Sequence, residues 1–186
     1  MKLMVIIAST RPGRVGLTVG NWFIDLAEKD KRLEVVTADL AKVNLPFIDE
    51  PNHPKMLEYT KEHTKKWSKQ VTAADAFVIV TPEYNFSAPA TIINALDYLY
   101  NEWNYKAVGF VSYGALPAGT RAVTQIKQLA TTLKMVPMYE AVSIPFVQSF
   151  IDSNQVFTPN ELIIDSAKVM IDELLRWDGA LKTLRK

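Results

Sequence analysis

The fold is decided by the stretch Leu3-Met4-Val5-Ile6-Ile7-Ala8-Ser9-Thr10-Arg11-Pro12-Gly13-Arg14-Val15-Gly16. It opens with a continuous apolar run from Leu3 to Ala8, which is typical of a strand that is covered on both faces of a parallel sheet. A polar loop follows at once. Beyond the loop, apolar residues recur with helical spacing, at Val15, Val19, Trp22, Phe23 and Leu26. A strand, a loop and a helix in this order form the first half of a βαβ unit.

The same alternation continues along the chain. Apolar runs return at residues 33–38, 75–81, 107–113 and 136–142, and the last fits a strand only if Pro137 lies at its start or at an edge. Helical spacing returns over 55–74, 92–100 and 122–133, and after the capping box Thr158-Pro159-Asn160-Glu161, with Pro159 at the first helical position. The sequence therefore predicts an α/β fold in a single domain over residues 1–186. We expect a flavodoxin-like, doubly wound, five-stranded parallel sheet of order 2-1-3-4-5.

Composition excludes several classes of function. The 186 residues carry 21 Lys and Arg against 20 Asp and Glu, so a net charge of +1 gives no general attraction for nucleic acid. The chain has no Cys, which excludes thiolate nucleophiles, zinc–thiolate sites and iron–sulfur clusters. His53 and His63 lack the spacing of metal ligands, so no metal site is predicted. The first apolar run is too short for a secretory signal or a membrane span, which predicts a cytoplasmic protein with no membrane partner.

Ligands of a doubly wound sheet bind beyond the carboxyl ends of its strands, so the loops at that edge hold the candidate site. The first loop, Ser9–Gly16, places hydroxyls, arginines and glycines at a helix N-terminus, where free N–H groups and the helix dipole favour a phosphate monoester. It has neither a G-x-G-x-x-G fingerprint nor a P-loop, which favours one terminal phosphate over a pyrophosphate. The alternative for this loop is a solvated turn capped by Thr10.

Two further loops offer surfaces for a flat ring. The second loop, Thr81–Pro89, supplies aromatic rings and polar groups at Glu83, Tyr84, Asn85 and Phe86. The third loop, Ser112–Thr120, supplies Tyr113 and also Gly114, where the backbone can approach a ring closely. Either loop alone could be an ordinary connection from a strand to a helix. Together with the phosphate loop, they predict a site for a phosphorylated heteroaromatic ring.

Five short motifs follow one another in the order expected of one known family. They are ASTRPGRVG (8–16), PEYN (82–85), NALD (94–97), SYG (112–114) and GTRA (119–122). The set resembles the NAD(P)H-dependent FMN reductase family, which comprises flavodoxin-like quinone and azo reductases, over roughly Lys2 to Phe146. The resemblance implies bound FMN, with Ser9, Arg11, Arg14, Val15, Gly16 and Leu17 in the phosphate loop and Pro82, Glu83, Tyr84, Asn85, Ser112, Tyr113 and Gly114 around the ring.

The resemblance also implies an activity. It is that of an oxidoreductase which transfers hydride from NAD(P)H, a transient substrate, through FMN to quinones, azo compounds or free flavin. The chemistry belongs to the cofactor, so no catalytic side chain is predicted. Arg14 and Arg121 are candidates to bind the phosphates of NAD(P)H. Ala8 replaces the usual glycine and residues 115–118 replace a more glycine-rich stretch, which predicts narrower access to the ring.

A homodimer with the flavin near its interface is a further implication of the resemblance. Two long loops support it because they carry apolar residues that would be unusual on a monomer, namely Leu45, Phe47, Ile48, Phe146 and Val147. Two alternatives share the fold. One is a flavodoxin-type electron carrier, which the net charge of +1 disfavours because such carriers tend to be acidic. The other is a non-enzymatic, flavin-binding regulatory protein.

Overall fold

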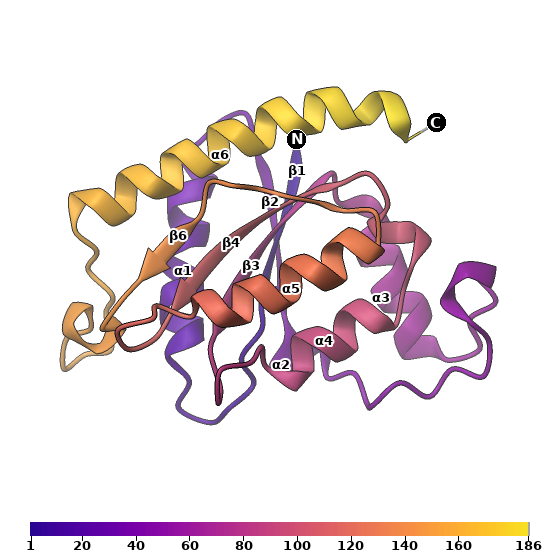
Figure 1. Cartoon of the computed structure of the whole chain (residues 1–186), viewed down its shortest axis with the longest axis horizontal. Helices are drawn as coiled ribbons and strands as arrows, with labels where there is room; N and C mark the ends of the chain where they lie inside the picture. The colour runs from indigo at the N-terminus through magenta and orange to yellow at the C-terminus, as the bar shows by residue number, and fades with distance from the viewer. Residues whose placement is uncertain (186) are drawn as a thin grey trace.

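The structure is a computed structural model that describes residues 1–185, and its centre is a parallel β-sheet (Figure 1). The strands are β1 (Lys2–Ile7), β2 (Glu34–Asp39), β3 (Ala76–Pro82), β4 (Ala107–Tyr113), β5 (Val136–Pro137) and β6 (Val142–Ile144). The sheet order is β2-β1-β3-β4-β5, with β6 also paired to β4. The predicted order 2-1-3-4-5 is confirmed.

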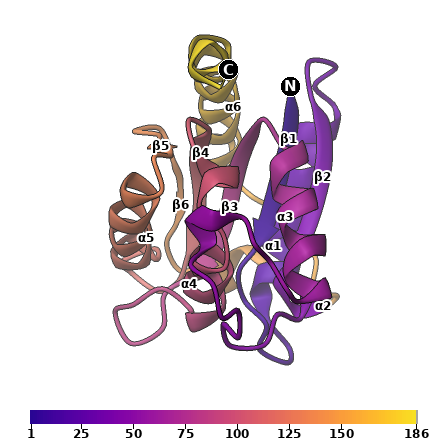
Figure 2. The same ribbon diagram turned by 90° about the vertical axis from the view of Figure 1, so that its right-hand side faces the viewer.

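Helices cover both faces of the sheet (Figure 2). One face packs against α1 (Val15–Glu28) and α6 (Glu161–Leu181), and the other against α3 (Glu62–Ala73), α4 (Ala90–Asp97) and α5 (Thr120–Thr132). The short helix α2 (Leu40–Val43) follows β2, and single 3-10 turns occupy 54–56, 101–103, 147–150 and 182–184. Alternate residues of β1 enter opposite layers, because Leu3 and Val5 pack toward α1 while Met4 packs toward α3. This two-sided burial explains the continuous apolar runs.

The fifth strand is not continuous, so the predicted single strand 136–142 is wrong. β5 ends at Pro137 and β6 begins at Val142, although both pair in parallel with β4. Val108 pairs with Pro137 and Val111 with Val142, so the edge strand uses two more residues than β4 over the same interval. The extra residues form a bulge in which Tyr139 is 92% exposed. The chain after β6 therefore leaves from the same edge of the sheet as the chain after β4.

The predicted helix over 55–74 begins later than expected. A 3-10 turn at 54–56 ends at Leu57, which has a left-handed φ of 58°, and α3 starts only at Glu62. Glu50 holds the residues that lead into the helix, because its carboxylate accepts hydrogen bonds from the backbone N–H groups of Thr60 and of the N-cap residue, Lys61, at 2.8 and 2.9 Å. The start of α3 is thus set by a residue that lies far ahead of it in the sequence.

The cap of the C-terminal helix also differs from the prediction. Asn160 is the N-cap, and its side chain accepts from the N–H of Ile163 at 3.0 Å. Pro159 precedes this cap instead of opening the helix. Thr158 lies ahead of the helix, where its backbone N–H donates to the carbonyl of Phe150 at 2.8 Å beside a short antiparallel contact. Asparagine is among the strongest N-cap residues, so the helix starts two residues later.

The hydrogen bonds that Glu50 accepts ahead of α3 predict a dependence of stability on pH. Burial raises the pKa of Glu50, but hydrogen bonds from Thr60 and Lys61 outweigh it and lower this pKa from 4.5 to about 2. A lowered pKa stabilises the folded chain above the unfolded value, and this contribution is lost as the pH falls toward the folded value. In urea titrations from pH 7 to pH 2.5, we expect Glu50→Gln to lower the unfolding midpoint at neutral pH, and the difference from wild type to shrink below pH 4.5. A difference that stays constant over this range would contradict this role of the ionised Glu50 carboxylate.

Candidate functional site

A cleft of about 540 Å³ opens at the carboxyl ends of β1, β3 and β4. Predicted site residues from all three loops line it, namely Ser9, Arg11, Arg14, Val15, Pro82, Glu83, Tyr84, Tyr113 and Gly114. These loops are far apart in the sequence, and they meet here because parallel strands end at one edge of the sheet. The cleft therefore unites the three loops that the sequence singles out.

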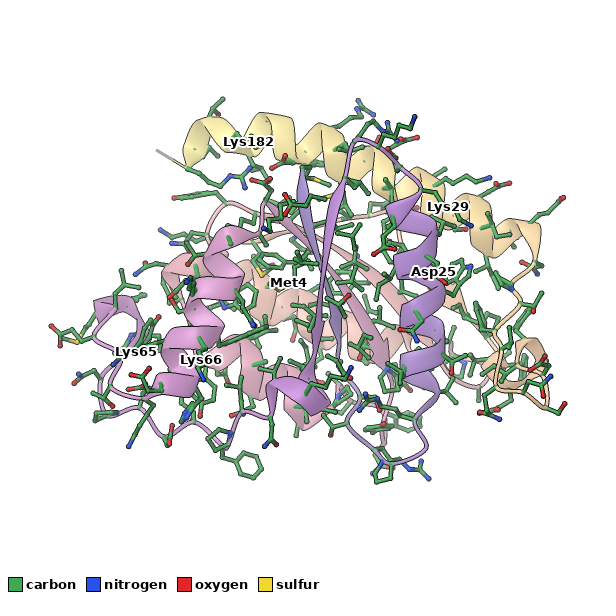
Figure 3. All side chains as sticks on the ribbon, turned by 180° about the vertical axis from the view of Figure 1, so that it is seen from behind. Met4, Asp25, Lys29, Lys65, Lys66 and Lys182 are labelled. Carbon is green, nitrogen blue, oxygen red and sulfur yellow. The ribbon has the colours of Figure 1, made fainter. Side chains whose placement is uncertain are left out.

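A larger groove of about 780 Å³ lies elsewhere, between α1 and α6. Figure 3 labels Asp25 on α1 and Lys29 just after its last turn, and both residues line this groove. Its charges alternate in sign, and Arg32 already pairs with Asp30 and Asp172. The groove contains none of the predicted site residues, so the cleft at the strand ends is the candidate site.

One end of the cleft offers donors that suit a phosphate. Helix α1 begins at Val15, and its N-cap residue, Arg14, provides no side-chain hydrogen bond to the first turn. The N–H groups of this turn are therefore open to an anion at the positive end of the helix dipole. The hydroxyl of Ser9 lies beside them, 2.7 Å from the hydroxyl of Tyr84, and the exposed Arg11 also lines the cleft.

Gly16 is required by how closely this turn packs. A Cβ atom added to Gly16 would lie 2.3 Å from the hydroxyl oxygen of Tyr113 and 3.3 Å from Cβ of Ser9. The first turn of α1 therefore packs so closely that only glycine fits at position 16. The open N–H groups of this turn and the hydroxyl of Ser9 suit a compact anion with several acceptor oxygens. Burial raises the pKa of Tyr113, so its phenol stays neutral and can donate at physiological pH.

The other end of the cleft is walled by two rigid turns. Tyr84 and Ser87 exchange backbone hydrogen bonds of 2.9 and 3.0 Å across a tight turn, in which Asn85 and Phe86 both adopt positive φ. Such conformations are costly for residues other than glycine and gather at functional sites. The carboxylate of Glu83 accepts from the guanidinium of Arg121 at 2.7 Å and from its backbone N–H at 3.0 Å. This pair joins the turn after β3 to the start of α5.

Four predicted residues lie outside the lining of the cleft. Gly16 is beneath it against Tyr113, and Leu17 is exposed one residue further along α1. Asn85 lines a neighbouring cavity of about 480 Å³. Ser112 is fully buried, and its hydroxyl has no hydrogen-bond partner within residues 1–185.

Arg14 is engaged in a buried ion pair. Its guanidinium donates to the carboxylate of Asp39 at 2.6 Å, and the side chains are only 13% and 4% exposed. Asp39 also caps α2 by accepting from the N–H of Ala41 at 3.1 Å. The pair ties the phosphate loop to the end of β2, so Arg14 holds the loop in place through one of its terminal nitrogens.

Sequence reasoning missed a fourth wall of the cleft, formed by residues 146–149. Two backbone hydrogen bonds attach it to the third loop, from Val147 to Gly114 at 3.0 Å and from Phe146 to Ala115 at 3.3 Å. The signal was the strand before it, since a segment that follows a parallel strand emerges at the same edge. The sequence predicts that strand over 136–142, but the apolar residues Phe146 and Val147 are assigned there to a dimer patch. Val147 is buried, so its predicted place in an exposed apolar patch is wrong.

The fold, with its cleft at the carboxyl edge of the sheet, defines a class of protein, the flavodoxin-like α/β proteins. Comparison with known proteins identifies the family. The sequence pattern of the family described as NADPH-dependent FMN reductase matches residues 1–149. The chain belongs to this family.

Individual relatives agree with this assignment. An NAD(P)H-dependent FMN reductase of Schizosaccharomyces pombe is 39% identical over 164 residues, which cover 84% of this chain and 82% of that protein. A quinone reductase of Pseudomonas putida is 28% identical over 182 residues, or 93% and 92% of the two chains. The solved structure of FerB, a flavoenzyme NAD(P)H:(acceptor) oxidoreductase from Paracoccus denitrificans, has the same fold, with a TM-score of 0.77 at 22% identity over 96% and 97% of the chains. The predicted family and the predicted enzyme class are confirmed.

Within residues 1–185, no helix combines the length and the apolar character that crossing a bilayer requires.

Proposed function

We propose that the chain binds FMN in the cleft and transfers hydride from NAD(P)H to a quinone, an azo compound or free flavin. The observation that carries the proposal is the division of the cleft, with phosphate donors at the N-terminus of α1 and flat, rigid walls after β3 and β4. FMN, when bound, supplies the hydride chemistry. The family and the P. putida relative, itself named a quinone reductase, support this acceptor class.

In this proposal the residues of the chain bind and orient the cofactor. Ser9, Arg11 and the first-turn N–H groups at Val15, Gly16 and Leu17 hold the phosphate, while Arg14 fixes their loop through Asp39. The ring lies against residues 82–85 on one side and 112–114 on the other. Backbone and side-chain donors along these turns stabilise negative charge on the reduced ring. A single domain over residues 1–186 is part of the same proposal.

The proposal is tested on the purified protein. The filtrate of the denatured protein should contain FMN, and NADH or NADPH should bleach the flavin of the native protein and support quinone reduction. Because one pocket would serve both substrates in turn, double-reciprocal plots at several quinone concentrations should be parallel. Reduction by neither nucleotide would overturn the proposed activity, and turnover that requires a protein partner would favour the electron carrier.

Arg11 provides the most direct test of the phosphate end. A charge-assisted hydrogen bond contributes about 1.5 to 3 kcal/mol, so Arg11→Ala should weaken FMN binding roughly ten-fold or more. Because Arg11 is exposed, the unfolding midpoint should hardly change. Flavin fluorescence titration of the apoprotein measures the affinity. Equal affinities of the variant and wild type would remove Arg11 from the site.

We also propose a homodimer, formed through the loop between α2 and α3. This loop exposes Phe47 to 82%, together with Ile48, Met56 and Leu57, while Leu45 packs against the core instead of joining the patch. Asn94 fixes the loop, because its side chain donates to Pro46 at 2.7 Å and accepts from the N–H of Ile48 at 3.0 Å. Light scattering at micromolar concentration should give about twice the 21.0 kDa of one chain, whereas a mass near 21.0 kDa would contradict the dimer.

A further inference from the structure

A second cavity adjoins the cleft on the side away from the phosphate loop. It has a volume of about 480 Å³ and shares Glu83, Gly114 and Ala115 with the cleft. The N-terminus of α5 lies on it, beside the loop that follows β4 (Figure 1). A molecule lying over the ring walls of the cleft could therefore extend into this side cavity without crossing the phosphate loop.

Arg121 is the cationic residue that lines the side cavity. Its guanidinium is fixed on two sides, by Glu83 at 2.7 Å and by the ring of Phe86, whose centroid lies 4.2 Å from Cζ. The side chain nevertheless remains 46% exposed. Glu83 contacts one terminal nitrogen, so the remaining guanidinium N–H groups of Arg121 are left to face a ligand.

The turn that carries Phe86 has a backbone conformation that costs free energy. Asn85 and Phe86 have φ values of 51° and 65°, in the region that residues with a Cβ atom rarely adopt. This conformation sets the aromatic ring against the guanidinium of Arg121. A pre-oriented arginine loses less conformational entropy when it binds an anion, which favours a recognition role.

Three arginines line the two cavities, and the structure separates their roles. Arg11 lies at the phosphate end of the cleft, and Arg14 is committed to Asp39. Arg121 lies at the opposite end. The nicotinamide must lie against the exposed face of the flavin ring, so the rest of the dinucleotide has to leave the cleft at one of its sides.

We propose that Arg121 binds a phosphate group of the NAD(P)H dinucleotide in the side cavity, and that Glu83 and Phe86 position its guanidinium. The inference rests on the proposed function. It assigns different roles to the two candidate arginines, because Arg14 pairs with Asp39 and is not assigned to NAD(P)H. The phosphate bound is either the pyrophosphate, which NADH and NADPH share, or the 2′-phosphate of NADPH, and the two sources give different results below.

The test measures binding without turnover. Calorimetric titration of the FMN-loaded protein uses two redox-inactive probes, ADP-ribose for the pyrophosphate and adenosine 2′,5′-bisphosphate for the 2′-phosphate. Arg121→Gln should weaken binding of at least one probe about ten-fold, as expected for one charge-assisted hydrogen bond, and Arg121→Lys should recover part of the loss. A loss for ADP-ribose identifies the pyrophosphate, and a loss for the bisphosphate alone identifies the 2′-phosphate.

The matched control is Arg176→Gln, which removes an arginine that pairs with Glu173 and is 77% exposed on α6. It should leave the binding of both probes unchanged. FMN affinity of Arg121→Gln should stay within two-fold of wild type, which separates nucleotide binding from a collapse of the cleft. If wild type is reduced by NAD(P)H but both probes bind Arg121→Gln as they bind wild type, the inference fails alone. If neither nucleotide reduces the wild-type flavin, the proposed function itself fails.

Discussion

Asp39→Ala is expected to destabilise the protein by about 3 to 5 kcal/mol, because it leaves the buried Arg14 guanidinium without its counter-ion. The Nε of Arg14 is already buried without a partner within residues 1–185, so the ion pair is its main polar compensation. The same substitution removes the cap of α2 at Ala41. Because Arg14 precedes the first turn of α1, FMN affinity should fall as well. Urea unfolding of the apoprotein and FMN titration measure the two effects.

Asp30→Ala is the matched control for this prediction. Asp30 also pairs with an arginine, but Arg32 is 57% exposed, and pairs of this kind contribute less than about 1 kcal/mol. The double variant Arg14→Met with Asp39→Leu removes both charges and should recover much of the lost stability, since an apolar pair can replace a buried ion pair. Equal effects of Asp39→Ala and Asp30→Ala would show that the buried pair does not hold the phosphate loop.

Gly16→Ala is expected to weaken FMN binding by disturbing the packing beneath the cleft. The new Cβ would lie 2.3 Å from the hydroxyl of Tyr113, so either the phenol moves into the cleft or α1 moves away from it. Overpacking of this kind costs about 1 to 3 kcal/mol, which corresponds to roughly 5-fold to 100-fold in affinity if binding restores the original packing. Fluorescence titration of FMN into the apoprotein measures the change.

Gly179→Ala makes the same substitution in a helix where a Cβ would meet nothing within 4 Å. It should stabilise the protein by up to about 1 kcal/mol and leave FMN affinity unchanged, because alanine is the better helix former. The opposite signs at two helical glycines isolate the packing against Tyr113. If Gly16→Ala bound FMN as tightly as wild type, the packing of the first turn of α1 against Tyr113 would be looser than the structure indicates.

Much of the fold could be predicted because parallel strands buried on both faces leave an unmistakable pattern of apolar runs. Leu3–Ala8 and Ala107–Tyr113 are such runs, and their order placed the three loops at one edge. The exceptions depend on partners distant in sequence. Glu50 holds the residues just before α3, and Asp39 pairs with the guanidinium of Arg14. Neither interaction leaves a local signal in the sequence. The wall at 146–149 was missed because its apolar residues were assigned to a dimer patch, and its backbone hydrogen bonds to Gly114 and Ala115 leave no local signal.

Because of the bulge between β5 and β6, the edge strand can accept inserted residues at a point where the inner strands cannot. β5 and β6 are each anchored to β4 by their own ladder, so residues added beside Tyr139 would extend an exposed loop without moving Phe146 and its neighbours. An inner strand offers no such place, since one added residue there would turn every following side chain to the other face. Position 139 is therefore where a fluorescent label or a peptide tag can be inserted while the geometry of the cleft is preserved.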